Sequence, residues 1–294
     1  MANLFCFGLG YSATHYLARY GARFMRVTGT VRTPEKAAAL PASAARKAYV
    51  FDGTTGSREI EAEVRAAQAV LISAPPGEGS DPVLRHFADA IAAAPTLSSI
   101  VYLSTIGVYG DHKGGWVDET TPPAPMSERS RARLAAEQAW SALGGRVEKA
   151  VAILRLAGIY GPGQNALMQV RRGTARRVVK PGQYFNRIHV FDIAQVVDAS
   201  FRTSANGVFN VADDLPTAPG APLAYAARLL RLPPPAELSF EEAAKGMSPM
   251  ALSFYGESKR VRNNSLAALG ITLRYPTFRE GLGALAESGE GKAS

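Results

Sequence analysis

Short apolar runs alternate with amphipathic stretches through the first half of the chain. The apolar runs have the length of buried strands and cover residues 3–8, 23–31, 47–52, 69–74, 99–104 and 149–156. The stretches between them have helical periodicity and cover residues 11–21, 33–40, 57–67, 81–94 and 126–143. Pro34 and Pro82 fall in the first turns of two of these helices, where a missing N–H is tolerated, and Asp81 is predicted to cap the second.

This order of elements predicts the fold class. Continuous apolar strands separated by helices are typical of a parallel sheet covered on both faces. We therefore predict an α/β protein with a Rossmann-type, doubly wound parallel sheet and a smaller C-terminal substrate domain. The predicted divisions are the Rossmann-type domain at 1–158, a smaller substrate-side domain at 159–288 that interleaves with it near 188–211, and a disordered tail at 289–294.

A glycine-rich turn follows the first predicted strand. It reads GLGYSA, a Gly-x-Gly-x-x-Ala pattern, and opens a helix, which is the context that a dinucleotide-binding turn requires. Gly8 would permit the tight turn, Gly10 would let the backbone approach a pyrophosphate, and Ala13 would let the helix pack closely on the strand. The predicted cofactor-binding turn is Gly8, Leu9, Gly10, Tyr11, Ser12 and Ala13.

The end of the second strand predicts which dinucleotide binds. An NAD site usually has an acidic residue about 20 residues after the glycines, but this chain has none before Glu35. Arg32 is placed to meet a 2′-phosphate, with Thr30 and Thr33 as hydroxyl donors. The sequence therefore favours NADP(H) over NAD(H), although Arg32 could also be a solvated loop residue. Asp52, after the third strand, either accepts from the adenine amino group or is a turn residue.

Four segments in order resemble the extended and atypical branches of the short-chain dehydrogenase/reductase family, which include epimerase/dehydratase-like proteins. They are GLGYSA (8–13), YLSTIGVYG (102–110), RLAGIYGPG (155–163) and NRIHVFDIA (186–194). The resemblance covers most of the chain. It implies an NAD(P)-binding fold, a catalytic hydroxyl after the fifth strand, and a Tyr-x-x-x-Lys pair on the next helix.

Carrying the family pattern over residue by residue gives Thr105 as the catalytic hydroxyl. If Glu137 matches the glutamate of the family's Tyr-x-x-x-Lys-x-x-x-Glu helix, Arg129 takes the tyrosine position and Arg133 the lysine position. Arginine stays protonated in proteins, so Arg129 cannot serve as the general acid or base. Arg133 could still bind the ribose hydroxyls, and Arg129 could bind an anionic group of the substrate. This places the chain in an atypical subgroup that lacks the Tyr-x-x-x-Lys pair.

Other residues follow from the same resemblance. Tyr109 and Tyr160 are expected on loops that face the cofactor, where either could be a displaced acid or a packing residue and Tyr160 could contact substrate. Arg187 matches an arginine that meets a substrate phosphate or carboxylate. The turn after the fourth strand, Ser73, Ala74 and Pro75, is expected to line the cofactor. His189 and Asp192 are expected to fix local structure, with Asp192 capping a helix that begins at residue 193.

Composition narrows the function classes. Of 294 residues one is cysteine, and the four histidines are scattered, so we expect no metal site and a reduced, cytoplasmic setting. The chain has no apolar run of about 18 residues, so no membrane association is expected. The net charge of +8 suits an anionic ligand or a basic solvated surface. Without a recognisable module we expect no nucleic-acid binding.

Two functions remain. One is an oxidoreductase or epimerase/dehydratase-like enzyme that acts on a small substrate, anionic or neutral, by non-standard proton transfer. The other is a non-catalytic NADP(H)-binding sensor or regulator of the same fold. The resemblance also implies a homodimer, because members of the family often pair through the helices after the fourth and fifth strands.

Overall fold

The computed structural model describes residues 2–40, 45, 47–77 and 79–291. Its largest element is a seven-stranded sheet in the order β11-β7-β5-β4-β1-β2-β3, in which every neighbouring pair is parallel. The strands are β1 (Asn3–Phe7), β2 (Arg26–Val31), β3 (Lys47–Val50), β4 (Ala69–Ile72), β5 (Ser99–Thr105), β7 (Ala150–Leu156) and β11 (Gly207–Val211). The predicted α/β doubly wound fold is confirmed, and β11 is a seventh strand that the sequence pattern did not reveal.

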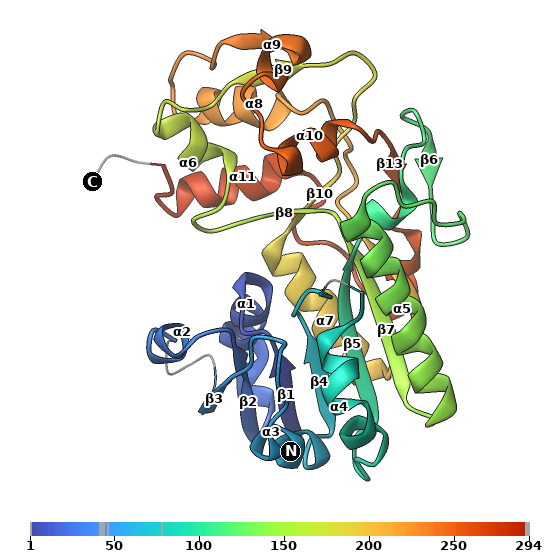
Figure 1. Ribbon diagram of the computed structural model, residues 1–294. Helices are drawn as coiled ribbons and strands as arrows, with labels where there is room; N and C mark the ends of the chain where they lie inside the picture. The colour runs from blue at the N-terminus through green and yellow to red at the C-terminus, as the bar shows by residue number, and fades with distance from the viewer. Residues whose placement is uncertain (1, 41–44, 46, 78, 292–294) are drawn as a thin grey trace.

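Helices cover both faces of the sheet, and each face has its own apolar core (Figure 1). On one face α1 (Tyr11–Tyr20) packs beside α7 (Val190–Thr203). On the other face lie α3 (Arg58–Arg65), α4 (Pro82–Ala92) and α5 (Glu128–Arg146). The predicted cap Asp81 accepts from the N–H groups of Val83 and Leu84 at 2.8 and 3.2 Å. A short helix, α2 (Pro34–Ala38), follows β2.

A smaller, separate core forms the upper part of the molecule in Figure 1. It is built from α6 (Ala166–Arg171), α8 (Ala221–Leu229) and α11 (Phe278–Glu287). Three two-stranded pairs join distant segments: β8 (Gly158–Tyr160) with β10 (Arg187–His189), β9 (Arg177–Val179) with β12 (Glu237–Ser239), and β6 (Trp116–Val117) with β13 (Arg260–Val261). The remaining elements are α9 (Phe240–Ala244), α10 (Pro249–Tyr255) and the 3₁₀ turns η1 (Gly21–Arg23), η2 (Ile106–Tyr109) and η3 (Asn264–Leu269).

The chain crosses between the two parts more than once. Residues 158–189 build the smaller part, and α7 and β11 then return to the large sheet. α8 and α11 belong to the smaller part again, whereas η3 packs against β11 and α7. The C-terminal end differs from the expected disordered tail, because Glu290 accepts from the N–H of Gly163 at 3.0 Å and Gly291 accepts from Arg171 at 2.7 Å. Residues 292–294 of that predicted tail lie outside the described residues. None of the helices in the described ranges is long and apolar enough to cross a bilayer.

Candidate functional site

The glycine turn connects β1 to α1. Gly8 has a φ of +90°, and its N–H donates to the hydroxyl of Thr30 at 3.0 Å. A Cβ at position 8 would lie 2.8 Å from the Ala74 nitrogen, so the turn and the end of β4 require glycine there. Gly10 is the N-cap of α1 and offers no capping side chain, and a Cβ at position 10 would meet nothing within 4 Å. The first N–H groups of α1 therefore face open space.

The rest of the turn is structural. Ala13 is fully buried against the sheet, and the backbone N–H of Leu9 donates to the Thr30 carbonyl at 2.8 Å. The Tyr11 hydroxyl donates to the Pro162 carbonyl at 2.9 Å, which ties α1 to the loop after β8. Burial and the nearby Glu290 raise the pKa of Tyr11 to about 12.

A cavity of about 440 Å³, here called the N-terminal cleft, opens beside this turn. Its lining includes Gly8, Leu9, Gly10 and Thr30, with the basic side chains of Arg32, Lys36 and Arg85 further along. All three basic side chains are exposed, and that of Arg85 donates to the carbonyl of Gly53. The lining of the cavity thus combines an uncapped helix start with three cations.

Two side chains of this cleft have local roles. Asp52 accepts from the N–H and hydroxyl of Thr54 at 2.8 and 2.6 Å, and these bonds lower the pKa of Asp52. It is therefore held as a turn residue, the second of the two options for it. Thr33 caps α2 by accepting from the Lys36 N–H at 3.4 Å, and Thr30 is buried under the glycine turn.

The turn after β4 joins the N-terminal cleft to a second cavity. The N–H groups of Ser73 and Ala74 both donate to the Phe7 carbonyl, at 2.8 and 2.9 Å, which fixes the turn against β1. Ser73, Ala74 and Pro75 line the N-terminal cleft, and Ser73 also lines the second cavity. The two cavities therefore meet at Ser73.

The second cavity, here called the central cleft, has a volume of about 360 Å³ and lies at the carboxyl ends of β5 and β7. Ser12, Thr105, Arg129 and Arg133 line it, so the structure brings these sequence-predicted residues together. Thr105 ends β5 and caps η2, and its hydroxyl oxygen accepts from the Gly107 N–H at 3.1 Å. Its hydroxyl hydrogen has no acceptor among the hydrogen bonds of the described residues.

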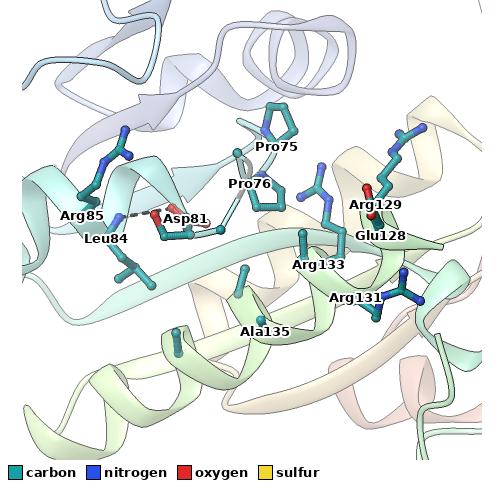
Figure 2. Close-up of a pocket in the computed structure, with 16 residues that line it drawn as sticks. Pro75, Pro76, Asp81, Leu84, Arg85, Glu128, Arg129, Arg131, Arg133 and Ala135 are labelled. Carbon is teal, nitrogen blue, oxygen red and sulfur yellow. Dashed lines mark hydrogen bonds between the residues drawn. The ribbon is translucent and has the colours of Figure 1, made fainter. Parts of the chain in front are cut away.

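Both arginines project from the first turns of α5, and Figure 2 shows Arg133 next to Pro76 with Arg129 further away from it. Arg133 donates to the Leu103 carbonyl at 2.8 Å and to the Tyr102 hydroxyl at 3.1 Å. Arg129 is exposed and makes no hydrogen bond or ion pair with the described residues. Both also line a wide cleft of about 1360 Å³ between the N-terminal ends of α4 and α5.

A buried ion pair sets the position of α5. Glu137 accepts from Arg155 of β7 at 2.8 Å and from the hydroxyl of Ser104, and both charged side chains are almost fully buried. A buried charge is tolerated when it is paired and hydrogen-bonded, as here. Glu137, which matches the glutamate of the family's helix, therefore fastens α5 to β5 and β7. This attachment directs Arg129 and Arg133 toward the central cleft.

The sequence did not single out several residues of the central cleft. Lys259 is 6% exposed, and its ammonium donates to the Gly110 carbonyl and to Glu257, both at 2.7 Å. Glu257, Phe254, Tyr184 and Asn186 line the same cavity. Lys259 lies in the run SKRVR, which has the composition of a solvated segment, so no local signal marked it as buried.

The structure corrects both predicted loop tyrosines. Tyr109 is fully buried and donates to Asn210 at 2.8 Å, with Arg155 stacked 4.8 Å from its ring centre. Tyr160 lies in β8 with its ring packed on His189, and burial raises its pKa well above the usual value. Neither residue lines the central cleft: Tyr109 is packed in the interior, and Tyr160 lines the neighbouring cavity of about 380 Å³.

Arg187 is also displaced from its expected place. Its guanidinium donates to the Phe185 carbonyl at 3.0 Å and to the Thr217 hydroxyl at 2.8 Å, with longer bonds to two further carbonyls. It lines a neighbouring cavity of about 380 Å³ rather than the central cleft. Burial lowers the pKa of Arg187 to about 10. The guanidinium of Arg187 therefore donates to protein acceptors where a substrate anion was expected.

The predicted helix cap was assigned to the wrong residue. His189 is the N-cap of α7, and its Nδ1 accepts from the Phe191 N–H at 3.1 Å. Asp192 lies in the first turn and accepts from the N–H groups of Arg274 and Tyr275 at 2.7 and 3.2 Å. Its carboxylate therefore fastens the C-terminal segment to α7. The described residues contain no group of metal-ligating side chains.

Comparison with known proteins finds a family match over part of the chain and one relative that is similar over its whole length. Residues 83–212 match the model of the NAD dependent epimerase/dehydratase family. A conserved protein of unknown function from Silicibacter pomeroyi is 43% identical, with a TM-score of 0.89, covering 99% of this chain and all of that one. Protein YeeZ of Escherichia coli is 30% identical over 189 residues, 61% of this chain and 65% of that protein.

A more distant structure has the same fold. The human epimerase family protein SDR39U1, solved with NADPH, is 17% identical with a TM-score of 0.72, covering 97% of this chain and 99% of that one. The matched family region contains β5 with Thr105, the start of α5 and Gly158, all of which contribute to the lining of the central cleft. The chain is therefore similar over residues 83–212 to the NAD dependent epimerase/dehydratase family, and over its whole length to the Silicibacter pomeroyi protein.

Proposed function

We propose that this chain binds NADP(H) across the two joined cavities and acts on a small substrate in the central cleft, as an oxidoreductase or an epimerase/dehydratase-like enzyme. The observation that carries the proposal is the continuity at Ser73 between the cleft beside the glycine turn and the cleft that contains Thr105. One cavity suits a dinucleotide, and the other places a reacting group beside Thr105.

The residues present fit a dinucleotide. The open space at Gly10 and the uncapped first N–H groups of α1 would hold the pyrophosphate. The turn from Ser73 to Pro75 would line the middle of the cofactor, and Arg133 would reach the ribose next to the nicotinamide. When bound, the nicotinamide supplies or accepts a hydride.

The basic end of the N-terminal cleft favours NADP(H) over NAD(H). Arg32 and Lys36 are exposed in the lining, and Arg85 lies across from them. A 2′-phosphate would gain charge-assisted hydrogen bonds from these side chains, whereas a bare ribose hydroxyl would gain little. The NADPH found with the distant human relative agrees with this choice.

Proton transfer would follow a non-standard route. Thr105 would hold a substrate oxygen, and Arg129 would hold an anionic group without exchanging a proton. The lining residues that can exchange a proton are Glu257, Lys259 and Tyr184. We propose that the reaction uses one of these groups in place of the family's Tyr-x-x-x-Lys pair.

Two variants test the proposal. Arg32→Ala should weaken NADPH binding about tenfold and leave NADH binding unchanged, whereas the control Arg65→Ala, at the distant end of α3, should change neither. Fluorescence titration gives both affinities, and wild-type protein that binds the two cofactors equally would refute the NADP(H) preference. Thr105→Ala should abolish turnover with carbonyl substrates and preserve NADPH binding.

The second candidate is an NADP(H) sensor. Arginine at positions 129 and 133 favours it, because arginine cannot carry out the family's proton step. Tight NADPH binding together with absence of turnover over a broad carbonyl and nucleotide-sugar panel would select the sensor over the enzyme.

We also propose a homodimer that pairs α4 and α5 with the same helices of a second copy. Ala135 and Ala139 are exposed on α5 along the wide cleft, and such small side chains allow close approach of a neighbouring helix. Sedimentation should give a dimer for wild-type protein and a monomer for Ala135→Glu.

A further inference from the structure

The central cleft has an apolar wall that is open to solvent. Phe254 of α10 lines the cleft and is 56% exposed, and α10 buries none of its side chains. Ile159 of β8 lines the same cleft and is 38% exposed. Large apolar side chains that remain exposed inside a concave site gain stability when a ligand covers them.

The same cleft has excess positive charge. Three cations line it, Arg129, Arg133 and Lys259, against one carboxylate, Glu257. Glu257 already neutralises Lys259, and Arg133 is directed to the Leu103 carbonyl. The guanidinium of Arg129 is the cation that the described residues leave for a ligand, and its planar donors match a carboxylate.

The neighbouring cavity does not extend the cleft toward a diphosphate. It shares Gly158, Ile159 and Phe185 with the central cleft and is lined by Arg176 and Arg187. Arg187 donates to Phe185, Thr217 and two further carbonyls, and Arg176 donates to the carbonyls of Gly173 and Ala175. A diphosphate would have to break these bonds before it could pair with either arginine.

We infer that the central cleft takes a small aromatic carboxylate, with the carboxylate on Arg129 and the ring against Phe254 and Ile159, and not a nucleotide sugar. The inference rests on the proposed function, since the nicotinamide shares this cavity. A volume of about 360 Å³ is near the lower end of small-molecule sites, roughly 300–1,000 Å³, which leaves room beside a nicotinamide for a compact substrate.

The test uses the full chain saturated with NADP⁺ and measures dissociation constants by calorimetry and ligand-observed NMR. The probes are benzoate, phenylacetate and 3-phenylpropionate, the neutral phenylacetamide, and UDP-glucose. At least one carboxylate should bind about tenfold more tightly than phenylacetamide. Arg129→Gln should remove that preference, and Phe254→Ala should weaken the binding of phenylacetate and of phenylacetamide about fivefold. Arg131→Gln, on the same helix but outside the central cleft, should change neither.

Three results would overturn the inference: no carboxylate binding up to about 10 mM, no carboxylate that binds more tightly than phenylacetamide, or displacement of the carboxylate by UDP-glucose at lower concentration. Both variants alter exposed side chains, so circular dichroism should show unchanged folding. A parallel NADPH titration separates the two proposals. If NADPH does not bind while Arg129→Gln still removes the carboxylate preference, the cofactor proposal fails and this inference stands.

Discussion

The N-terminal cleft and the central cleft lie side by side but are assembled in different ways. The first takes its lining from residues 8–85, mostly from turns that directly follow β1, β2, β3 and β4. The second combines Ser12, Thr105, Arg129, Gly158 and Lys259, which come from segments spread over most of the chain. A site formed by successive strand ends can be found from local patterns, whereas one formed by distant segments depends on packing.

The two clefts also differ in how their polar groups are held. In the N-terminal cleft the backbone forms the key surface, and the side chains of Arg32 and Lys36 are exposed. In the central cleft Lys259, Glu257 and Arg133 are fixed by partners inside the protein. Substitution of Lys259 or Glu257 should therefore change stability as well as binding, whereas substitution of the exposed Arg32 or Lys36 should change binding alone.

The largest expected effect is at Lys259. Lys259→Met leaves Glu257 and the Gly110 carbonyl buried without their partner, and breaking such a buried pair should lower the free energy of unfolding by about 3–5 kcal/mol. Urea unfolding measures it. The control Lys245→Met, on an exposed residue, should stay within about 0.5 kcal/mol. A loss at Lys259 no larger than the control's would show that the central cleft is not held by its own charged groups.

The next effect concerns His189, at which the chain passes from β10 of the smaller part to α7 on the large sheet. His189 is 4% exposed, and burial, with a smaller contribution from His15, lowers its pKa from 6.5 to about 4. Its neutral Nδ1 caps α7. Between pH 6.5 and 4 the histidine is protonated in the unfolded state but neutral in the folded state. The free energy of unfolding should therefore fall by roughly 3 kcal/mol over this range because of His189.

Other groups titrate over part of the same pH range, so the test compares the stability of wild type with that of a variant at each pH. Burial raises the pKa of Asp213 to about 8, and this group destabilises the fold as the pH rises, the opposite sign. His189→Asn keeps a capping acceptor and cannot titrate. The stability difference between wild type and His189→Asn should change in favour of the variant below pH 6.5, and His86→Asn should show no such trend. A flat difference profile would exclude His189 as the source.

The smallest effect separates folding from binding within the glycine turn. Gly8→Ala should lower stability by more than about 2 kcal/mol, because φ is +90° and the new Cβ would lie 2.8 Å from the Ala74 nitrogen. Gly10→Ala meets nothing and should change stability by less than about 1 kcal/mol, the range for a helix N-cap. It should nevertheless weaken NADPH binding about tenfold. Unchanged NADPH affinity in Gly10→Ala would place the pyrophosphate elsewhere.

The errors of the sequence interpretation lie almost entirely in the central cleft and its surroundings. Tyr109, Tyr160 and Arg187 each follow or belong to a motif that suggested a ligand contact, yet each is held by protein partners. A motif fixes where the backbone runs, but the side chain's neighbours come from other segments. Lys259 was missed for the same reason, since its burial depends on Gly110 and Glu257 in a folded arrangement.

The sequence by itself determined the alternating elements, the parallel sheet and the glycine turn, because apolar period, glycine stereochemistry and capping act over a few residues. Only the tertiary structure decided which charged groups face the central cleft and which are neutralised inside the protein. That choice depends on pairing and burial between segments separated by up to about 150 residues, as for Gly110 with Lys259, and no local pattern records it.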